Sequence, residues 1–321
     1  MFAMRGIAVS FSVFVILYSA LSAAVSGVWR RVWLGGQRYS ARRCADLLFV
    51  LRLAPLVVAA GVTLMLAVPS FLLLEPRAVD EPIGAVPVLL SLCGMALLLA
   101  GVWKASTALV RASRNIALWS SEGRASAPRP IDSMNSISVL RISGVAPPLT
   151  AAGILRPTVW LSRAAEFVLT ERELETALRH EVVHVRRRDN LRKLVLRLVA
   201  FPGMAELESA WREATEMAAD DAAVSSASEA LDLAAAVIKL SRLAPLEPSA
   251  ELTTALVHSP AESVNARVER LIAWTEQQHN PATGYSLKYA FCAAVVVVAT
   301  LAVTYSELLV RVHAATEWLV R

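Results

Sequence analysis

The chain has 321 residues, of which 56% are apolar and only 18% are charged, and its mean hydropathy is +0.51. An ordinary soluble domain carries about 45–50% apolar and about 25% charged residues, so this composition excludes a disordered chain and disfavours a wholly water-soluble fold. The net charge of +5 comes from arginines beside apolar runs, which favours contact with a lipid bilayer over direct nucleic-acid binding.

Four uncharged apolar runs approach or exceed the length of about 20 residues that crosses a membrane. They are Gly6–Val28, Leu53–Leu74, Ile83–Trp103 and Tyr289–Ser306, and the last could extend through Val310. The first run is longer than the apolar core of about 7–15 residues in a cleavable signal peptide, so we expect it to be retained. The sequence therefore predicts a multi-pass membrane protein with four spans.

Charge asymmetry between the loops predicts the orientation of these runs. The loop after the first run holds six arginines against one acidic residue, Asp46, whereas the loop after the second run has three acidic residues against Arg77. Since loops rich in Lys and Arg stay in the cytoplasm, the N-terminus should lie outside and the region after the third run inside. We expect three transmembrane helices over residues 1–104, a cytoplasmic domain over residues 105–288, and a fourth transmembrane helix with a short extracytoplasmic tail over residues 289–321.

The region between the third and fourth runs has the pattern of a mixed α+β domain. Residues 120–136 are rich in Ser, Pro and Gly and predict a linker. Alternation with period two predicts short strands at Ile137–Ser143 and Thr158–Ser162. A capping box that starts at Thr170 predicts a long helix to about Ala200. Further helices are expected at Ala205–Val224, Ala230–Arg242 and Ser263–Trp274.

The long helix contains the sequence His-Glu-Val-Val-His at residues 180–184. Because an α-helix turns once in 3.6 residues, His180 and His184 project from one face and can bind a single metal ion. Glu181 is rotated from that face by about 100° and can act as the general base on a metal-bound water. This spacing is typical of zinc hydrolases and predicts Zn²⁺ as the cofactor.

A catalytic zinc site needs a third protein ligand and one open position. No further histidine follows at the spacing of the metzincin extension, so the ligand must come from another segment. The next predicted helix offers Glu216 and Asp220, four residues apart. We predict that Glu216 is the third ligand and that Asp220 accepts the outer N–H of a zinc-bound histidine. Glu213 is a competing ligand.

Three further side chains are weak candidates for stabilising the oxyanion of a hydrolytic reaction. His258 lies in a loop beside a proline, and Arg267 and Arg270 lie in the last predicted helix. An exposed loop histidine and arginines paired with Glu269 are the simpler interpretations. The arginine run at residues 186–188 fits contacts with anionic headgroups or ion pairs within the fold, and we assign it no role in substrate binding.

The motif at residues 180–184 continues into Arg-Arg-Asp-Asn at residues 187–190. Together with the acids of residues 216–221 and the segment at residues 143–162, it resembles the membrane metallopeptidases of the BlaR/MecR type, family 56 of the metallopeptidases, which are antirepressors of bacterial β-lactam signalling. The resemblance implies a multi-pass protein of the bacterial inner membrane with a cytoplasmic, gluzincin-like α+β zinc peptidase domain. It also implies signal-induced cleavage of a cytoplasmic protein, a winged-helix repressor or the chain itself.

Two features depart from this family. Ala219 stands where family members often have a cysteine, and the sequence ends at Arg321, where the antibiotic sensors continue into a penicillin-binding domain. We therefore expect a separate sensor protein.

Two other functions stay open at this point. A catalytically idle membrane scaffold would not need the complete His-Glu-His-Glu set. A quality-control protease of the HtpX type would share the zinc site but would not account for the Arg-Arg-Asp-Asn segment.

Overall fold

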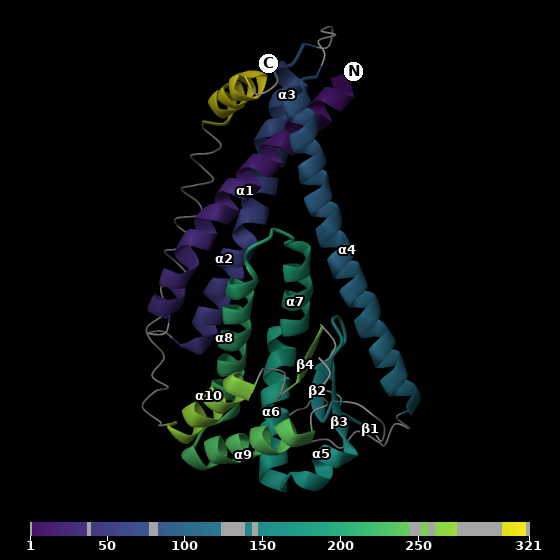
Figure 1. The fold of residues 1–321 in the computed structure, drawn as a ribbon, viewed down its shortest axis with the longest axis vertical. Coiled ribbons are helices and arrows are strands. Elements are labelled where there is room, and N and C mark those ends of the chain that lie inside the picture. The colour runs from purple at the N-terminus through teal and green to yellow at the C-terminus, as the bar shows by residue number, and fades with distance from the viewer. Residues whose placement is uncertain are drawn as a thin grey trace.

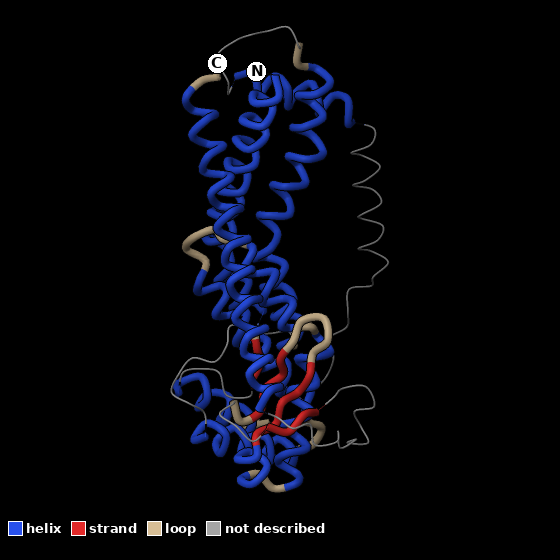
Figure 2. Tube along the Cα trace, turned by 90° about the vertical axis from the view of Figure 1, so that its right-hand side faces the viewer, coloured by secondary structure: helices blue, strands red, loops and turns tan. Residues whose placement is uncertain are grey.

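The computed structural model describes residues 2–36, 40–76, 83–122, 139–142, 147–243, 252–255, 261–274 and 304–318. These residues are mostly helical and include one small sheet. Figure 2 shows the strands at one end of the molecule, with both chain termini at the opposite end.

Three stretches of helix are long and apolar enough to cross a membrane, as the first three apolar runs predict. They are α1 (Phe2–Gly36), the continuous stack of α2 (Ala41–Val62), η1 (Thr63–Ala67) and α3 (Val68–Leu74), and α4 (Ala85–Glu122). In Figure 1 these helices converge near the N-terminus and spread apart toward the sheet.

The structure differs from one predicted boundary and describes only part of the predicted fourth span. Helix α4 continues past Lys104, so the predicted boundary between residues 104 and 105 lies inside a helix. Of the predicted fourth span, residues 289–303 lie outside the described residues, and the next described segment, residues 304–318, is helical.

A sheet domain, residues 139–274 as far as they are described, follows the long helices. Its strands are β1 (Val139–Ile142), β2 (Leu149–Ala152), β3 (Thr158–Ser162) and β4 (Thr253–Ala255), and its helices are α5 (Arg163–Val168), α6 (Glu171–Arg187), α7 (Asp189–Leu198), α8 (Ala205–Ala223), α9 (Ala227–Leu243) and α10 (Ala261–Ile272). The two predicted strands and the three later helices are confirmed. Alternation does not predict strand β2, all four of whose residues are buried, although the family resemblance of residues 143–162 implies a strand-turn-strand there.

The prediction of one unbroken helix from Thr170 to Ala200 is wrong. The capping box is present, since the Thr170 N–H donates to Glu173 Oε2 at 2.8 Å and Thr170 Oγ1 accepts from the Glu173 N–H at 3.4 Å. Arg188, however, adopts the left-handed conformation with φ of 55°, which ends α6 and starts α7. This conformation costs free energy for a residue with a Cβ, so tertiary contacts of its neighbours must hold it.

The sheet has the order β1-β3-β2-β4, with β3 parallel to β1 and antiparallel to β2, and β2 antiparallel to β4. Successive residues of β3 point to opposite faces. Val159 and Leu161 join the core formed with α6, α9 and α10, whereas Trp160 packs against Trp119 of α4, with ring centroids 6.1 Å apart. The long helix α4 therefore covers the second face of the sheet.

The tip of the α7–α8 hairpin inserts between the long helices (Figure 1). The buried guanidinium of Arg52 in α2 donates to the carbonyl of Val199 at 2.6 Å and lies 3.1 Å from Met204 Sδ. The Tyr18 hydroxyl of α1 accepts the Phe201 N–H at 3.2 Å. Because a buried charge within an apolar helix needs polar partners, these contacts fix the hairpin among the long helices.

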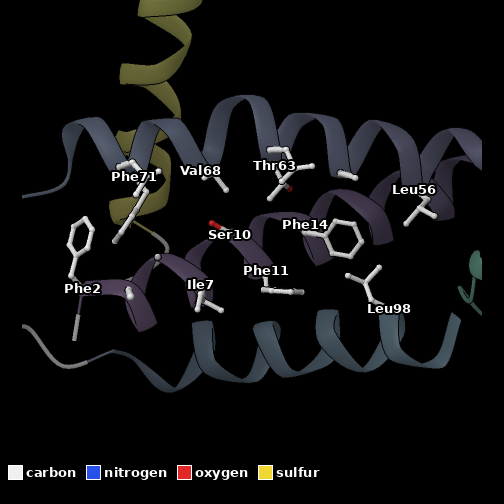
Figure 3. Close-up of a pocket in the computed structure, with 15 residues that line it drawn as sticks. Phe2, Ile7, Ser10, Phe11, Phe14, Leu56, Thr63, Val68, Phe71 and Leu98 are labelled. Carbon is white, nitrogen blue, oxygen red and sulfur yellow. The ribbon is translucent and has the colours of Figure 1, made fainter. Parts of the chain in front are cut away.

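A cavity of about 530 Å³ lies between α1, α4 and the α2–η1–α3 stack, near the N-terminal end of the molecule. Figure 3 shows its walls of aromatic and aliphatic side chains, among them Phe11, Phe14 and Leu98. The described lining includes no titratable side chain, so this cavity is not a candidate for acid–base chemistry.

Candidate metal centre

Three predicted ligands, His180, His184 and Glu216, meet where α6 packs against α8. Their ligand atoms all lie within 4.8 Å of one another, and this group could hold a metal ion. The Nε2 atoms of His180 and His184 are 3.1 Å apart, and the Glu216 oxygens lie 3.5 Å and 3.6 Å from them. Both histidines are buried, and Glu216 retains slight exposure.

A carboxylate holds the outer nitrogen of each histidine. Nδ1 of His180 lies 3.0 Å from Asp220 Oδ1, and Nδ1 of His184 lies 2.8 Å from Asp189 Oδ2. A carboxylate can only accept, so Nδ1 of His184 carries a proton and donates it to Asp189. The contact of His180 Nδ1 with Asp220 is within ion-pair distance but lacks hydrogen-bond geometry. Carboxylates beside the outer nitrogen orient metal-binding histidines, and here both Nε2 atoms face Glu216.

Arg267 supplies the positive charge that balances these acids. Its guanidinium donates to both carboxylate oxygens of Asp220, at 2.9 Å and 2.6 Å, and Nη1 lies 3.1 Å from Glu216 Oε2. Arg267 is buried, so this bidentate pair is shielded from solvent. Its nitrogens lie against Asp220 and Glu216, which favours a positioning role over the predicted contact with a reaction oxyanion.

The electrostatics of the group favour a bound positive charge. Burial lowers the pKa of His180, but the Asp220 and Glu216 carboxylates outweigh it and raise the pKa to about 9. Burial raises the pKa of Glu216, but His184 and Arg267 outweigh it and lower the pKa to about 2. A site that holds a proton this tightly among carboxylates is one where a cation can replace that proton.

Glu181 lies beside the three ligands but does not belong to their group. The carboxylate Oε2 accepts the Ala151 N–H of β2 at 3.1 Å, and burial raises the pKa of Glu181. Asn190 holds the same strand in place, because Nδ2 donates to the carbonyls of Ala151 and Gly153 at 3.1 Å and 3.3 Å. A buried carboxylate with a raised pKa beside a metal-binding group is suited to accept a proton.

The remaining predicted residues lie elsewhere or outside the described residues. Glu213, the competing ligand, is exposed on α8 and does not belong to the metal-binding group. Arg270 forms an ion pair with Asp221 and a hydrogen bond to the Met217 carbonyl. His258 lies outside the described residues.

Sequence reasoning missed the roles of Asp189 and Asn190. The sequence identifies both only as part of the segment at residues 187–190 and indicates no contact for either. The available signal was their position directly after the zinc motif. The turn that brings them back requires a left-handed residue, and Arg188 is not the Gly or Asn that usually marks one.

A second group with ligand-type side chains lies at the end of the molecule near both termini. It contains Glu75, His313 and Glu317. Glu75 already pairs with Arg5 at 3.2 Å, and the side chain of Glu317 is 44% exposed. The nearest His313 contacts, 3.9 Å to Glu75 and 3.7 Å to Glu317, are too long for hydrogen bonds. The group at His180 is therefore the stronger candidate.

Comparisons with known proteins found no family model and no curated protein that matches this chain.

Proposed function

We propose that this chain is a membrane-bound zinc endopeptidase. The observation that supports this proposal best is the convergence of His180, His184 and Glu216, with both imidazole Nδ1 atoms held by carboxylates. Tetrahedral zinc with bonds of about 2.0–2.1 Å brings its ligand atoms to about 3.3 Å from one another. The observed 3.1 Å between the two Nε2 atoms and 3.5 Å to Glu216 suit such an ion.

The residues around the metal-binding group have separate roles in the proposed peptide-bond hydrolysis. Bound zinc would lower the pKa of a water molecule and polarise the scissile carbonyl. Glu181 accepts the proton of that water and passes it to the leaving amine. The Ala151 N–H holds the Glu181 carboxylate at Oε2. Asp220 and Asp189 keep the two histidines in the tautomer that presents Nε2.

The proposed substrate is a cytoplasmic protein, either a transcriptional repressor or the chain itself, cleaved when a signal arrives. The support for this orientation is the arginine-rich stretch at residues 30–52, where the end of α1 connects to the start of α2, which the positive-inside rule assigns to the cytoplasm. The support for regulation is the α7–α8 hairpin, which contacts Tyr18 and Arg52 at its tip and carries Asp189 and Glu216 along its length. A shift of the long helices would reach the metal ligands through this hairpin.

The test separates the peptidase from an idle scaffold. Glu181→Gln should keep zinc and fold while lowering cleavage by about 10²–10⁴-fold, the usual effect of losing a general base. Glu171→Gln, which changes an exposed glutamate of the same helix, is the matched control. Zinc content and cleavage of a candidate repressor, or of the chain, are measured in triggered cells. Equal cleavage by parent and Glu181→Gln would reject the peptidase and favour a scaffold with structural zinc.

A further inference from the structure

A second cavity, of about 400 Å³, lies behind the metal-binding helix. It forms where the start of α2 meets α6, α7 and α8, so it adjoins the ends of the long helices that face the sheet domain. Val183, Ala218 and Ala222 contribute apolar wall, and most of the charged side chains of the lining are basic. The apolar cavity of Figure 3 lies among the long helices and is separate from it.

The lining of this cavity carries four arginines against one carboxylate. Arg42, Arg186, Arg187 and Arg192 line it, and among the residues that the structure describes the only acidic one in the lining is Asp46. Asp46 Oδ1 lies 2.6 Å from Arg192 Nη1, and this ion pair neutralises most of the Asp46 charge. The cavity therefore keeps an excess of about three positive charges, and it attracts anions.

Arg187 gives the strongest indication of a ligand. Its side chain is only 9% exposed, yet Nε and Nη2 have no hydrogen-bond acceptor among the described residues. The nearest carboxylate oxygens, on Asp189 and Asp46, lie 3.5 Å and 3.7 Å away, too far for good hydrogen bonds. Buried N–H groups of a guanidinium are costly to leave without acceptors, and adjacent Nε and Nη groups match two oxygens of one oxyanion.

We propose that this cavity binds a phosphate group. Guanidinium groups bind phosphate with bidentate geometry, and Arg42 and Arg186 are exposed at the rim, where they can close on further oxygens. The phosphate has two possible sources. Arg42 lies in the first turn of the second long helix, which is long and apolar enough to cross a membrane, so an anionic lipid headgroup can supply the phosphate. A soluble phosphate compound can also reach the exposed rim.

The experiment uses the full-length protein in two arms. In the first arm, binding of radiolabelled inorganic phosphate is measured by equilibrium dialysis with the protein in phosphatidylcholine nanodiscs. In the second arm, phosphatidylglycerol retained by the protein is counted by native mass spectrometry after purification from vesicles of equal phosphatidylglycerol and phosphatidylcholine. Binding in the first arm assigns a soluble phosphate, and retention in the second arm alone assigns a lipid headgroup.

The rim variant Arg42→Gln/Arg186→Gln tests the location. Neither Arg42 nor Arg186 has an ion-pair partner among the described residues. The control variant, Arg163→Gln/Arg172→Gln, removes the same charge from two exposed positions elsewhere. The rim variant should bind at least about 10-fold more weakly, as expected for losing one charge-assisted hydrogen bond, and the control should match the parent. Thermal melting verifies that both variants fold.

Two results would overturn the proposal: no binding in either arm, or equal loss in the rim and control variants. Neither assay requires zinc or peptide cleavage, so a failure here is distinguishable from a failure of the proposed peptidase function.

Discussion

Asp189 Oδ2 lies 2.8 Å from His184 Nδ1, although the two residues belong to different helices separated by the left-handed residue Arg188. The break in the helix turns Asp189 back against the zinc motif. From α8, Asp220 Oδ1 lies 3.0 Å from His180 Nδ1, within ion-pair distance. Each imidazole of the proposed zinc site is thus oriented by its own buried carboxylate.

The first prediction concerns Asp189. Asp189→Asn removes the charged acceptor of the His184 N–H, so zinc affinity should fall by about 10–100-fold, the range typical of losing a group that orients a metal ligand. Competition with a chromophoric chelator measures this affinity. Asp232→Asn on α9 is the control and should leave it unchanged. Equal affinity in parent and Asp189→Asn would show that the contact does not orient a metal ligand.

The second prediction concerns Arg267. Arg267→Met leaves the Asp220 and Glu216 carboxylates buried without their arginine, which should destabilise the metal-free protein by about 3–5 kcal/mol. Zinc supplies a compensating charge, so the loss should be smaller in the zinc-loaded protein. Unfolding with and without zinc measures the difference. Arg270→Met removes a partly exposed ion pair with Asp221 and should cost at most about 1 kcal/mol.

The third prediction concerns the docking of the hairpin on the long helices. A Cβ added to Gly101 of α4 would lie 2.2 Å from the Leu198 carbonyl oxygen, whereas one added to Gly61 meets no atom within 4 Å. Gly101→Ala should therefore lower the melting temperature in detergent, because backbone must move to relieve the clash. Gly61→Ala should keep or slightly raise it, since alanine favours helix. Identical melting of the two variants would contradict the close approach of α4 and α7.

The fourth prediction concerns pH. Burial raises the pKa of Glu229, but Arg179 and Ser225 outweigh it and lower the pKa to about 2. A lowered folded-state pKa adds stability that is complete above the unfolded value of about 4.5 and disappears as the pH falls toward 2. Glu229→Gln should destabilise the protein at pH 7 by about 1–2 kcal/mol and by progressively less below pH 4.5. Denaturant unfolding across this range, with exposed Glu269→Gln as the control, measures the difference.

The fifth prediction concerns orientation. The arginine asymmetry of the loops predicts that residues 77–82 lie outside the cytoplasm and that the region after α4 lies inside it. A reporter active only outside should work after Ala78, and one active only in the cytoplasm should work after Gly123. The reverse pattern at either position would mean that the proposed peptidase domain faces away from the cytosol.

Local residue patterns in the sequence are enough to predict the three long helices and the candidate metal ligands. Three long apolar runs predict the three long helices, because an apolar stretch of that length has few alternatives to a buried or membrane helix. The four-residue spacings of His180 with His184, and of Glu216 with Asp220, place each pair on one helical face wherever the helix lies. The candidate ligands and the candidate general base could therefore be named without tertiary information.

Only the tertiary structure decided which distant groups complete the site. Arg267 is 47 residues from Asp220, and the Ala151 N–H is 30 residues from Glu181, so no periodic pattern links either pair. The left-handed turn at Arg188, the entry of the α7–α8 hairpin between the long helices and the arginine-lined cavity all depend on how helices pack. Helical spacing acts over a few residues, whereas charge pairing between segments is set by the packing of the whole chain.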